Sequence, residues 1–433
     1  MTEPITSPEA TAPARGLTLV QGTAMYVGAV LGTGVIALPA LAAEAAGPAS
    51  LLAWVLLVII SAPLAATFAA LGSRYPDAGG VSTYARLAFG DRAAAVVGWC
   101  FYAAVPPGSA AAALFGGSYV AAATGGGRTT ITVTAVILMI VVTVTNWFGV
   151  QLTGRVQLGL AGLLVTFLLT AVIFSAPHAD LDNLRPFAPE GWAAIGPATA
   201  LLVWSFVGWE AITHLTAEFR HPEKDLTRAT AAAVALVGAI YLAVALAIIT
   251  VLGPAAAKST APLGELLAAA FGGNARYLAA VAAIMLTLGA MNAYYAGAAK
   301  LGAALGRDGA LPLWLARGSL AGEVPRRSLA VNAGGSLVVL LVVTVSSFGP
   351  RPLVLFTTGL FVTVYAVGIA AAVKLLPPHS AARTTAILAL VAVVFLVAMT
   401  GVYLAWALVA SLGALIYHRL APARKQEPSS VAA

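Results

Sequence analysis

The residues of this sequence that could do chemistry are concentrated in one apolar stretch, residues 201–228. It carries Ser205, Gly208, Glu210 and His214 among the residues of a membrane-spanning helix. A carboxylate at hydrocarbon depth is costly, so it is retained where it faces protein or water and serves a function. The run from Ser205 to Gly208 is also a poor helix interior, and irregular backbone at that depth is tolerated where it lines a cavity. We therefore predict that this stretch forms half of a substrate site.

A second apolar stretch, residues 17–43, is interrupted in the same way. It has Gly32, Thr33 and Gly34 near its centre and Pro39 five residues further on. Each Gly costs roughly 1 kcal/mol of helix stability relative to Ala, which favours an unwound joint. Small residues also serve close helix packing, and these three alone would favour that explanation. The matching interruption in the second half of the chain instead indicates an inverted repeat with a site at the repeat interface.

The two joints together suit a free amino acid. Unpaired N–H groups near Thr33 would lie at the positive end of a helix dipole, where a carboxylate binds well. Unwound carbonyl groups between Trp204 and Val207, Ser205 included, suit a primary ammonium group. Of the aromatic residues Trp204, Phe206 and Trp209, we expect one to contact the substrate and the others to pack in the core or face lipid.

The composition places these joints in a polytopic membrane protein. Of 433 residues, 60% are hydrophobic and 9% are charged, against roughly 25% charged in a soluble globular chain. The net charge of +7 does not point to nucleic acid, because the basic residues follow the loops. The single Cys100 lies in an apolar segment, so the sequence predicts no disulfide frame, and no metal or other cofactor is expected.

Twelve membrane spans of about 20 residues can be placed, which predicts an all-α fold. We expect two five-helix repeats, at 16–176 and 193–375, followed by two additional helices at 384–420. The ends, 1–15 and 421–433, are polar and Pro-containing and are predicted to be disordered tails. The predicted spans are 17–43, 49–72, 93–122, 129–147, 155–176, 194–219, 228–253, 276–304, 328–346, 351–374, 384–400 and 402–419.

The loops predict the orientation of the chain. With the N-terminus inside, all but five of the 23 Lys and Arg residues fall in cytoplasmic segments, as the positive-inside rule requires. Residues 1–15 lack the basic start and short apolar run of a signal peptide. Both termini are therefore predicted to lie on the cytoplasmic side of the cell membrane.

Three motifs carry a resemblance to the amino acid/polyamine/organocation (APC) superfamily of transporters. They are Leu-Gly-Thr-Gly-Val-Ile-Ala-Leu-Pro-Ala at 31–40, Arg-Tyr-Pro-Asp-Ala-Gly-Gly at 74–80 with Ala-Phe-Gly at 88–90, and Trp-Ser-Phe-Val-Gly-Trp-Glu at 204–210 with Glu-Phe-Arg-His-Pro-Glu-Lys-Asp-Leu at 218–226. With His214 and short tails, the chain most resembles the bacterial amino-acid efflux branch, typified by the methionine and branched-chain amino acid exporter.

The resemblance implies a five-plus-five inverted repeat of the leucine-transporter type with broken helices 1 and 6, and alternating access to an amino acid held between them. It also implies that span 8 contributes to the side-chain pocket. Counting back from the Asp-Gly-Ala-Leu-Pro motif at 308–312 places Tyr294 and Asn292 there.

The sequence favours protons over sodium as the coupling ion. A sodium cage of this architecture uses hydroxyl groups of span 8, yet residues 288–306 contain no Ser or Thr. Proton coupling needs one buried carboxylate, and Glu210 is the candidate. His214 and Glu218 follow it at intervals of four, so on a continuous helix the three share one face towards the inner loop. The alternative is that Glu210 only braces the joint.

A neutral substrate is expected, because the pocket region holds aromatic and small residues but no second carboxylate. We predict an aliphatic or thioether L-amino acid such as methionine, leucine, isoleucine or valine. Export is implied by the branch resembled. An importer with protons, an exchanger, or a sensor with a transporter fold are the alternatives, and whether the chain forms a homodimer is left open. An enzyme is not expected, since only one of five His residues is deep in the membrane.

Overall fold

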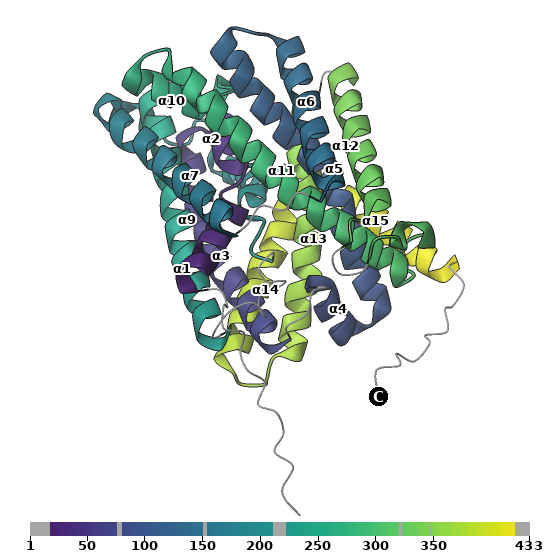
Figure 1. Cartoon of the computed structure of the whole chain (residues 1–433). Coiled ribbons are helices and arrows are strands. Elements are labelled where there is room, and N and C mark those ends of the chain that lie inside the picture. The colour runs from purple at the N-terminus through teal and green to yellow at the C-terminus, as the bar shows by residue number, and fades with distance from the viewer. Residues whose placement is uncertain are drawn as a thin grey trace, which may run out of the picture.

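The computed structural model describes residues 18–75, 80–149, 154–210, 222–319, 323–346 and 348–420. Within these ranges the chain is a bundle of α-helices joined by turns and 3-10 segments, and contains no β-strand (Figure 1). The α-helices are α1 (Leu19–Val30), α2 (Gly34–Ala46), α3 (Ser50–Arg74), α4 (Val81–Phe89), α5 (Asp91–Thr124), α6 (Arg128–Trp147), α7 (Gly154–Ser175), α8 (Ile195–Leu202), α9 (Pro222–Leu252), α10 (Pro262–Phe271), α11 (Ala275–Arg307), α12 (Arg326–Ser346), α13 (Arg351–Leu375), α14 (Ala381–Thr400) and α15 (Leu404–Leu420).

Nine stretches of the described residues are long and apolar enough to cross a membrane. Two of them, Gly34–Arg74 and Ala381–Leu420, run for 41 and 40 residues and contain two helices each. The span predicted at 17–43 contains two shorter helices, α1 and α2, and the described part of the span predicted at 194–219 contains α8 followed by a 3-10 segment. The chain is therefore a multi-pass helical membrane protein, while the count of twelve and the inverted repeat stay predictions.

The interrupted segments lie together inside the bundle. Helix α2 packs against α8 and the 3-10 segment η5 (Val203–Phe206), and α1 packs against α9. The long helices α5 and α11 contact each other, and α13 packs on α5. These helices surround the two joints, so a site at the joints is built from parts of the chain far apart in sequence.

The last three long helices differ in how deeply they are buried. Of the most apolar 18 residues of α13, 72% are buried. Of the most apolar 18 residues of Ala381–Leu420, the range that holds α14 and α15, 22% are buried. Gly401 separates α14 from α15 with a φ of +56°, a left-handed conformation that glycine adopts without strain. Helices α14 and α15 lie in the region 384–420 that was predicted to hold two additional helices, and their role as additions to two five-helix repeats stays a prediction.

Two short helices cover the ends of the bundle. Helix α10 lies in the 254–275 connection and buries Leu263, Leu266 and Leu267. Helix α4, which the sequence did not predict, is held in place by ion pairs of Arg86. Its guanidinium lies 3.1 Å from Asp91 and 3.1 Å from Asp308, at the end of α11. This contact links the α3–α5 connection to the helix that flanks the candidate site.

Candidate functional site

The first joint separates α1 from α2. Helix α1 ends at Val30, Leu31 turns out of the helical conformation with φ −74° and ψ 49°, and α2 begins at Gly34. Thr33 precedes α2 but its side chain makes no capping hydrogen bond. The N–H groups of the first turn of α2 are therefore uncapped by a side chain, at the positive end of the helix dipole. The break falls where Gly32, Thr33 and Gly34 predicted it.

The second joint follows α8. Segment η5 ends at Phe206, Val207 is extended with φ −73° and ψ 137°, and Gly208 has φ +128°. That φ is open to glycine and strained for other residues, so Gly208 fixes the position of the break. The described range that contains this joint ends at Glu210, two residues beyond Gly208. His214 and Glu218, predicted for a proton path, lie outside the described residues.

The two joints touch each other. A Cβ built on Gly34 would lie 2.5 Å from the Ser205 Oγ and 2.9 Å from the Ser205 Cα, so only glycine fits there. The Tyr241 hydroxyl of α9 lies 2.9 Å from the carbonyl oxygens of both Val30 and Ser205. One hydroxyl proton is thus shared between two carbonyl oxygens, one from each joint. This shared hydrogen bond holds the two unwound segments side by side.

Tyr241 was not predicted as a functional residue. Its ring stacks on Trp54 at 4.9 Å and packs on Phe206 at 5.1 Å, so its position is fixed by core packing. One feature of the sequence could have pointed to Tyr241: its phenol hydroxyl lies in an otherwise apolar span, and such a group needs a hydrogen-bond partner at hydrocarbon depth.

Glu210 is buried at the end of the second joint, with 1% of its surface exposed. Its Oε2 accepts the Gly208 N–H at 3.0 Å and the Tyr365 hydroxyl of α13 at 2.6 Å. Tyr365 in turn packs on Phe68 of α3 at 5.5 Å. The carboxyl group therefore braces the joint and connects it to α13, and a coupling role for Glu210 stays a prediction.

A small cavity of about 30 Å³ lies between the joints and the helices α5, α11 and α13. Three predicted site residues line it: Thr33, Trp204 and Tyr294. The remaining walls are small or apolar, with two hydroxyl groups; they include Gly108, Ser109, Met291, Thr357 and Phe361. This volume accommodates about two water molecules, so an amino acid needs the walls to move apart.

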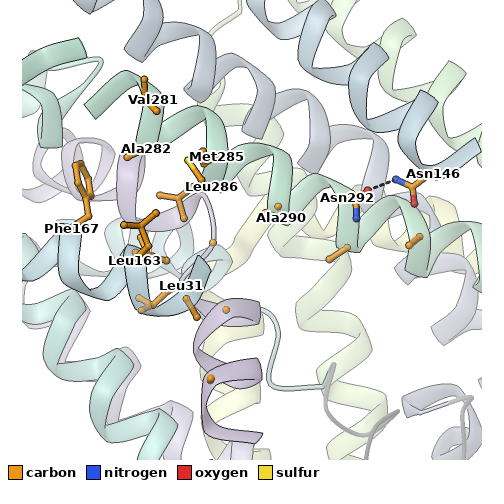
Figure 2. Close-up of a pocket in the computed structure, with 18 of the residues that line it drawn as sticks. Leu31, Asn146, Leu163, Phe167, Val281, Ala282, Met285, Leu286, Ala290 and Asn292 are labelled. Carbon is orange, nitrogen blue, oxygen red and sulfur yellow. Dashed lines mark hydrogen bonds between the residues drawn. The ribbon is translucent and has the colours of Figure 1, made fainter. Parts of the chain in front are cut away.

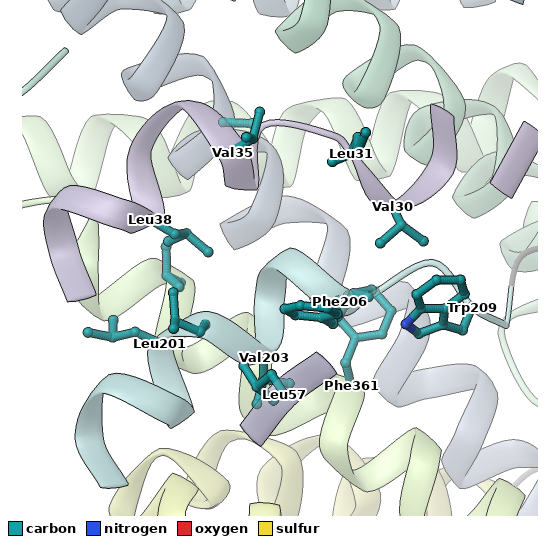
Figure 3. Close-up of a cluster of buried hydrophobic side chains, with 14 of the residues drawn as sticks. Val30, Leu31, Val35, Leu38, Leu57, Leu201, Val203, Phe206, Trp209 and Phe361 are labelled. Carbon is teal, nitrogen blue, oxygen red and sulfur yellow. The ribbon is translucent and has the colours of Figure 1, made fainter. Parts of the chain in front are cut away.

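The other residues predicted at the second joint lie in the core (Figure 3). Phe206 packs on Trp54 at 6.1 Å, and Trp209 packs on Tyr26 at 5.8 Å. Val207 is buried, and the carbonyl oxygen of Ser205 is occupied by the Tyr241 hydroxyl as described above. Among the three aromatic residues, Trp204 is the one that lines the cavity. Substrate contact by any of the three stays a prediction.

Asn292 lies away from the small cavity. Its Oδ1 accepts the Asn146 Nδ2–H at 2.8 Å, and Thr145 Oγ1 is 3.4 Å away (Figure 2). Asn292 lines a larger groove of about 990 Å³ between α1, α7 and α11, which reaches Gly32 of the first joint. The structure thus brings Thr33, Trp204 and Tyr294 together and places Asn292 on another face of α11.

Comparison with known proteins decides the family. The family model described as "Amino acid permease" matches residues 17–432, nearly the whole chain. This chain belongs to the amino acid permease family. The permease is therefore a membrane transporter of amino acids and not an enzyme, and the APC resemblance seen in the motifs is confirmed.

Two bacterial relatives match most of the length of this permease, and a third matches about half of it. It is 30% identical over 419 residues to the L-methionine/branched-chain amino acid exporter YjeH of Escherichia coli, covering 96% of this chain and 98% of that one. It is also 30% identical over 362 residues to the uncharacterized amino acid permease YecA of Bacillus subtilis, covering 84% and 85%. The branched-chain amino acid permease BcaP of Bacillus subtilis is 23% identical over 224 residues, 48% of each chain.

Proposed function

We propose that this permease exports neutral L-amino acids with aliphatic or thioether side chains in exchange for protons. The observation that carries the proposal is the small cavity between the joints, because the uncapped start of α2 and the side chains of Trp204, Met291 and Phe361 meet there. No charged side chain is among the described residues that line it. The exporter relative that matches along almost the whole chain supports the direction and the side-chain class.

In this proposal the two ends of the amino acid bind to different joints. The carboxylate would accept hydrogen bonds from the N–H groups at the start of α2, where the helix dipole and the unpaired donors favour an anion. The ammonium would bind unwound carbonyl groups near Trp204, with Ser205 engaged by Tyr241. The side chain would then point towards Met291, Tyr294 and Phe361, apolar surfaces that suit methionine, leucine, isoleucine and valine.

The proton would be carried by Glu210. Its carboxyl group is buried at the second joint and accepts hydrogen bonds from Gly208 and Tyr365, so a change in its protonation would be felt by the joint and by α13. We also propose that both termini face the cytoplasm, following the distribution of basic residues.

Transport into vesicles of both orientations tests the proposal. Labelled methionine and leucine, with lysine and glutamate as controls, are offered to right-side-out and inside-out vesicles with and without a pH gradient. Accumulation of methionine or leucine in inside-out vesicles, driven by an acidic interior, is the expected result. If a proton gradient drives uptake in right-side-out vesicles and not in inside-out vesicles, the permease is the importer. If uptake needs an amino acid inside the vesicles and no pH gradient, it is the exchanger. Preference for lysine or glutamate would refute the substrate class.

A further inference from the structure

The larger groove between α7 and α11 is unlike the small cavity in its lining. Its walls are formed largely by apolar residues of α1, α7 and α11, among them Leu31, Phe167 and Met285 (Figure 2). Leu163, Leu278 and Val281 along it are more than half exposed. In a protein that crosses the membrane, exposed apolar side chains of this kind face hydrocarbon, so the groove is open to the bilayer.

The volume of the groove arises from small residues on facing helices. Gly28 on α1 and Gly289 and Ala293 on α11 line it. A Cβ added to Gly289 would meet no atom within 4 Å, so the helices do not close over this position. Small residues usually let membrane helices approach closely. Here they leave about 990 Å³, at the upper end of the roughly 300–1,000 Å³ usual for ligand pockets.

One end of the groove carries charge. Lys300 of α11 lines it there, together with Glu323, and makes no hydrogen bond or ion pair with any residue in the described ranges. Lys300 is 11 residues beyond Gly289, which is roughly 16 Å along the helix axis. That length is about half of the roughly 30 Å hydrocarbon core, the depth that one leaflet occupies. The lining of the groove continues along α11 past Gly289 to Ala275, so only its part between Lys300 and Gly289 has the depth of one leaflet. A cation at the rim and an open apolar channel beneath it match a phospholipid.

We propose that this groove binds one zwitterionic phospholipid, with its phosphate at Lys300 and its acyl chains along α11 past Gly289. Glu323 at the same end disfavours a headgroup of net negative charge and suits a headgroup that carries an ammonium. Because Leu31 and Gly32 line the same groove, the acyl chains contact the first joint from the membrane side. The inference is independent of which amino acid is carried and in which direction.

Native mass spectrometry of the purified full-length permease tests this assignment. The protein is incubated with phosphatidylethanolamine or with phosphatidylglycerol of the same acyl chains, and retained lipid is counted after detergent exchange. Wild type is expected to retain one phosphatidylethanolamine. Gly289→Leu, whose side chain fills the groove, and Lys300→Gln, at the exposed rim, are each expected to lower retention at least fivefold.

Gly297→Leu is the matched control, because Gly297 is on the same helix, also has no atom within 4 Å of an added Cβ, and does not line the groove. It should retain the lipid as wild type does. Equal retention by wild type, Gly289→Leu and Lys300→Gln would overturn the site. Stronger retention of phosphatidylglycerol by wild type would overturn the headgroup assignment. Lys300→Gln changes only an exposed side chain, so its result stands even where Gly289→Leu folds poorly.

Discussion

Adding one methyl group to Gly34 tests the contact between the joints most directly. In Gly34→Ala the new Cβ would lie 2.9 Å from the Ser205 Cα, a backbone atom that cannot rotate away. Carbon atoms in contact prefer about 3.5–4.0 Å, so the joints must separate by roughly 0.6 Å or more. Gly32→Ala is the matched control two residues earlier, because its Cβ would meet only the Ala290 Cβ, at an ordinary 3.7 Å.

The size of the effect follows from the cost of overpacking. Forcing extra volume into a well-packed site costs typically about 1–3 kcal/mol. The shift falls on the start of α2, where the substrate carboxylate is proposed to bind, and on Ser205 beside the proposed ammonium site. If the whole cost is taken from binding, affinity falls roughly 5–150-fold. Gly32→Ala should change affinity less than about twofold, since it adds a methyl group without a clash.

The assay is equilibrium binding of labelled methionine to purified protein, normalised to the folded fraction from size-exclusion chromatography. Transport in proteoliposomes provides a second readout of the same variants. Binding by Gly34→Ala that equals wild type would refute the reasoning, because it would mean that the contact with Ser205 does not control the site. Equal losses in both variants would also refute it, since the structure distinguishes the two glycines.

Three further predictions concern the hydroxyl shared by the joints, the buried carboxyl group and the orientation of the chain. Tyr241→Phe leaves two buried carbonyl groups without their donor and should lower the free energy of unfolding by about 1–3 kcal/mol. It should weaken both thermal stability and methionine binding. The control is Tyr102→Phe, which removes a hydroxyl that donates to a carbonyl of α12 and should lower stability alone. Glu210→Gln keeps an acceptor oxygen for Gly208 but cannot titrate. Exchange of amino acid between equal concentrations on the two sides of the membrane should therefore persist, while accumulation driven by a pH gradient is lost. If the variant still accumulates amino acid, Glu210 has a structural role only. A cysteine at Ser319, in a background without the native cysteine, should resist an impermeant maleimide on intact cells, while one at the exposed Asp182 should react; the reverse pattern would overturn the orientation.

The breaks in the two central helices could be predicted from the sequence because their causes are local. Glycine at 32, 34 and 208 weakens a helix wherever it stands, and a neighbouring carboxyl group at membrane depth shows that the break serves a purpose. These signals need no knowledge of the rest of the fold. The first break was located within a few residues for that reason.

The partners of the site could not be predicted, because they depend on which helix faces meet. A membrane helix is apolar both towards lipid and towards its neighbours, so periodicity does not separate the two faces. Tyr241 and Tyr365 therefore gave no sign of reaching Ser205 and Glu210. Asn292 and Tyr294 are two residues apart on α11 and were expected in one pocket, yet they lie on different faces, as an advance of about 200° requires.

The shallow burial of α14 and α15 bears on how this part of the sequence can vary. A side chain that faces acyl chains meets a fluid neighbour which adapts to its shape, so leucine, valine and isoleucine are nearly interchangeable there. On α13 the neighbours are fixed side chains, and each exchange leaves a void or an overlap. Substitutions should therefore accumulate freely along residues 381–420 as long as hydropathy is kept, while 351–375 changes slowly. Homologous permeases aligned over both regions should show that contrast in substitution rate.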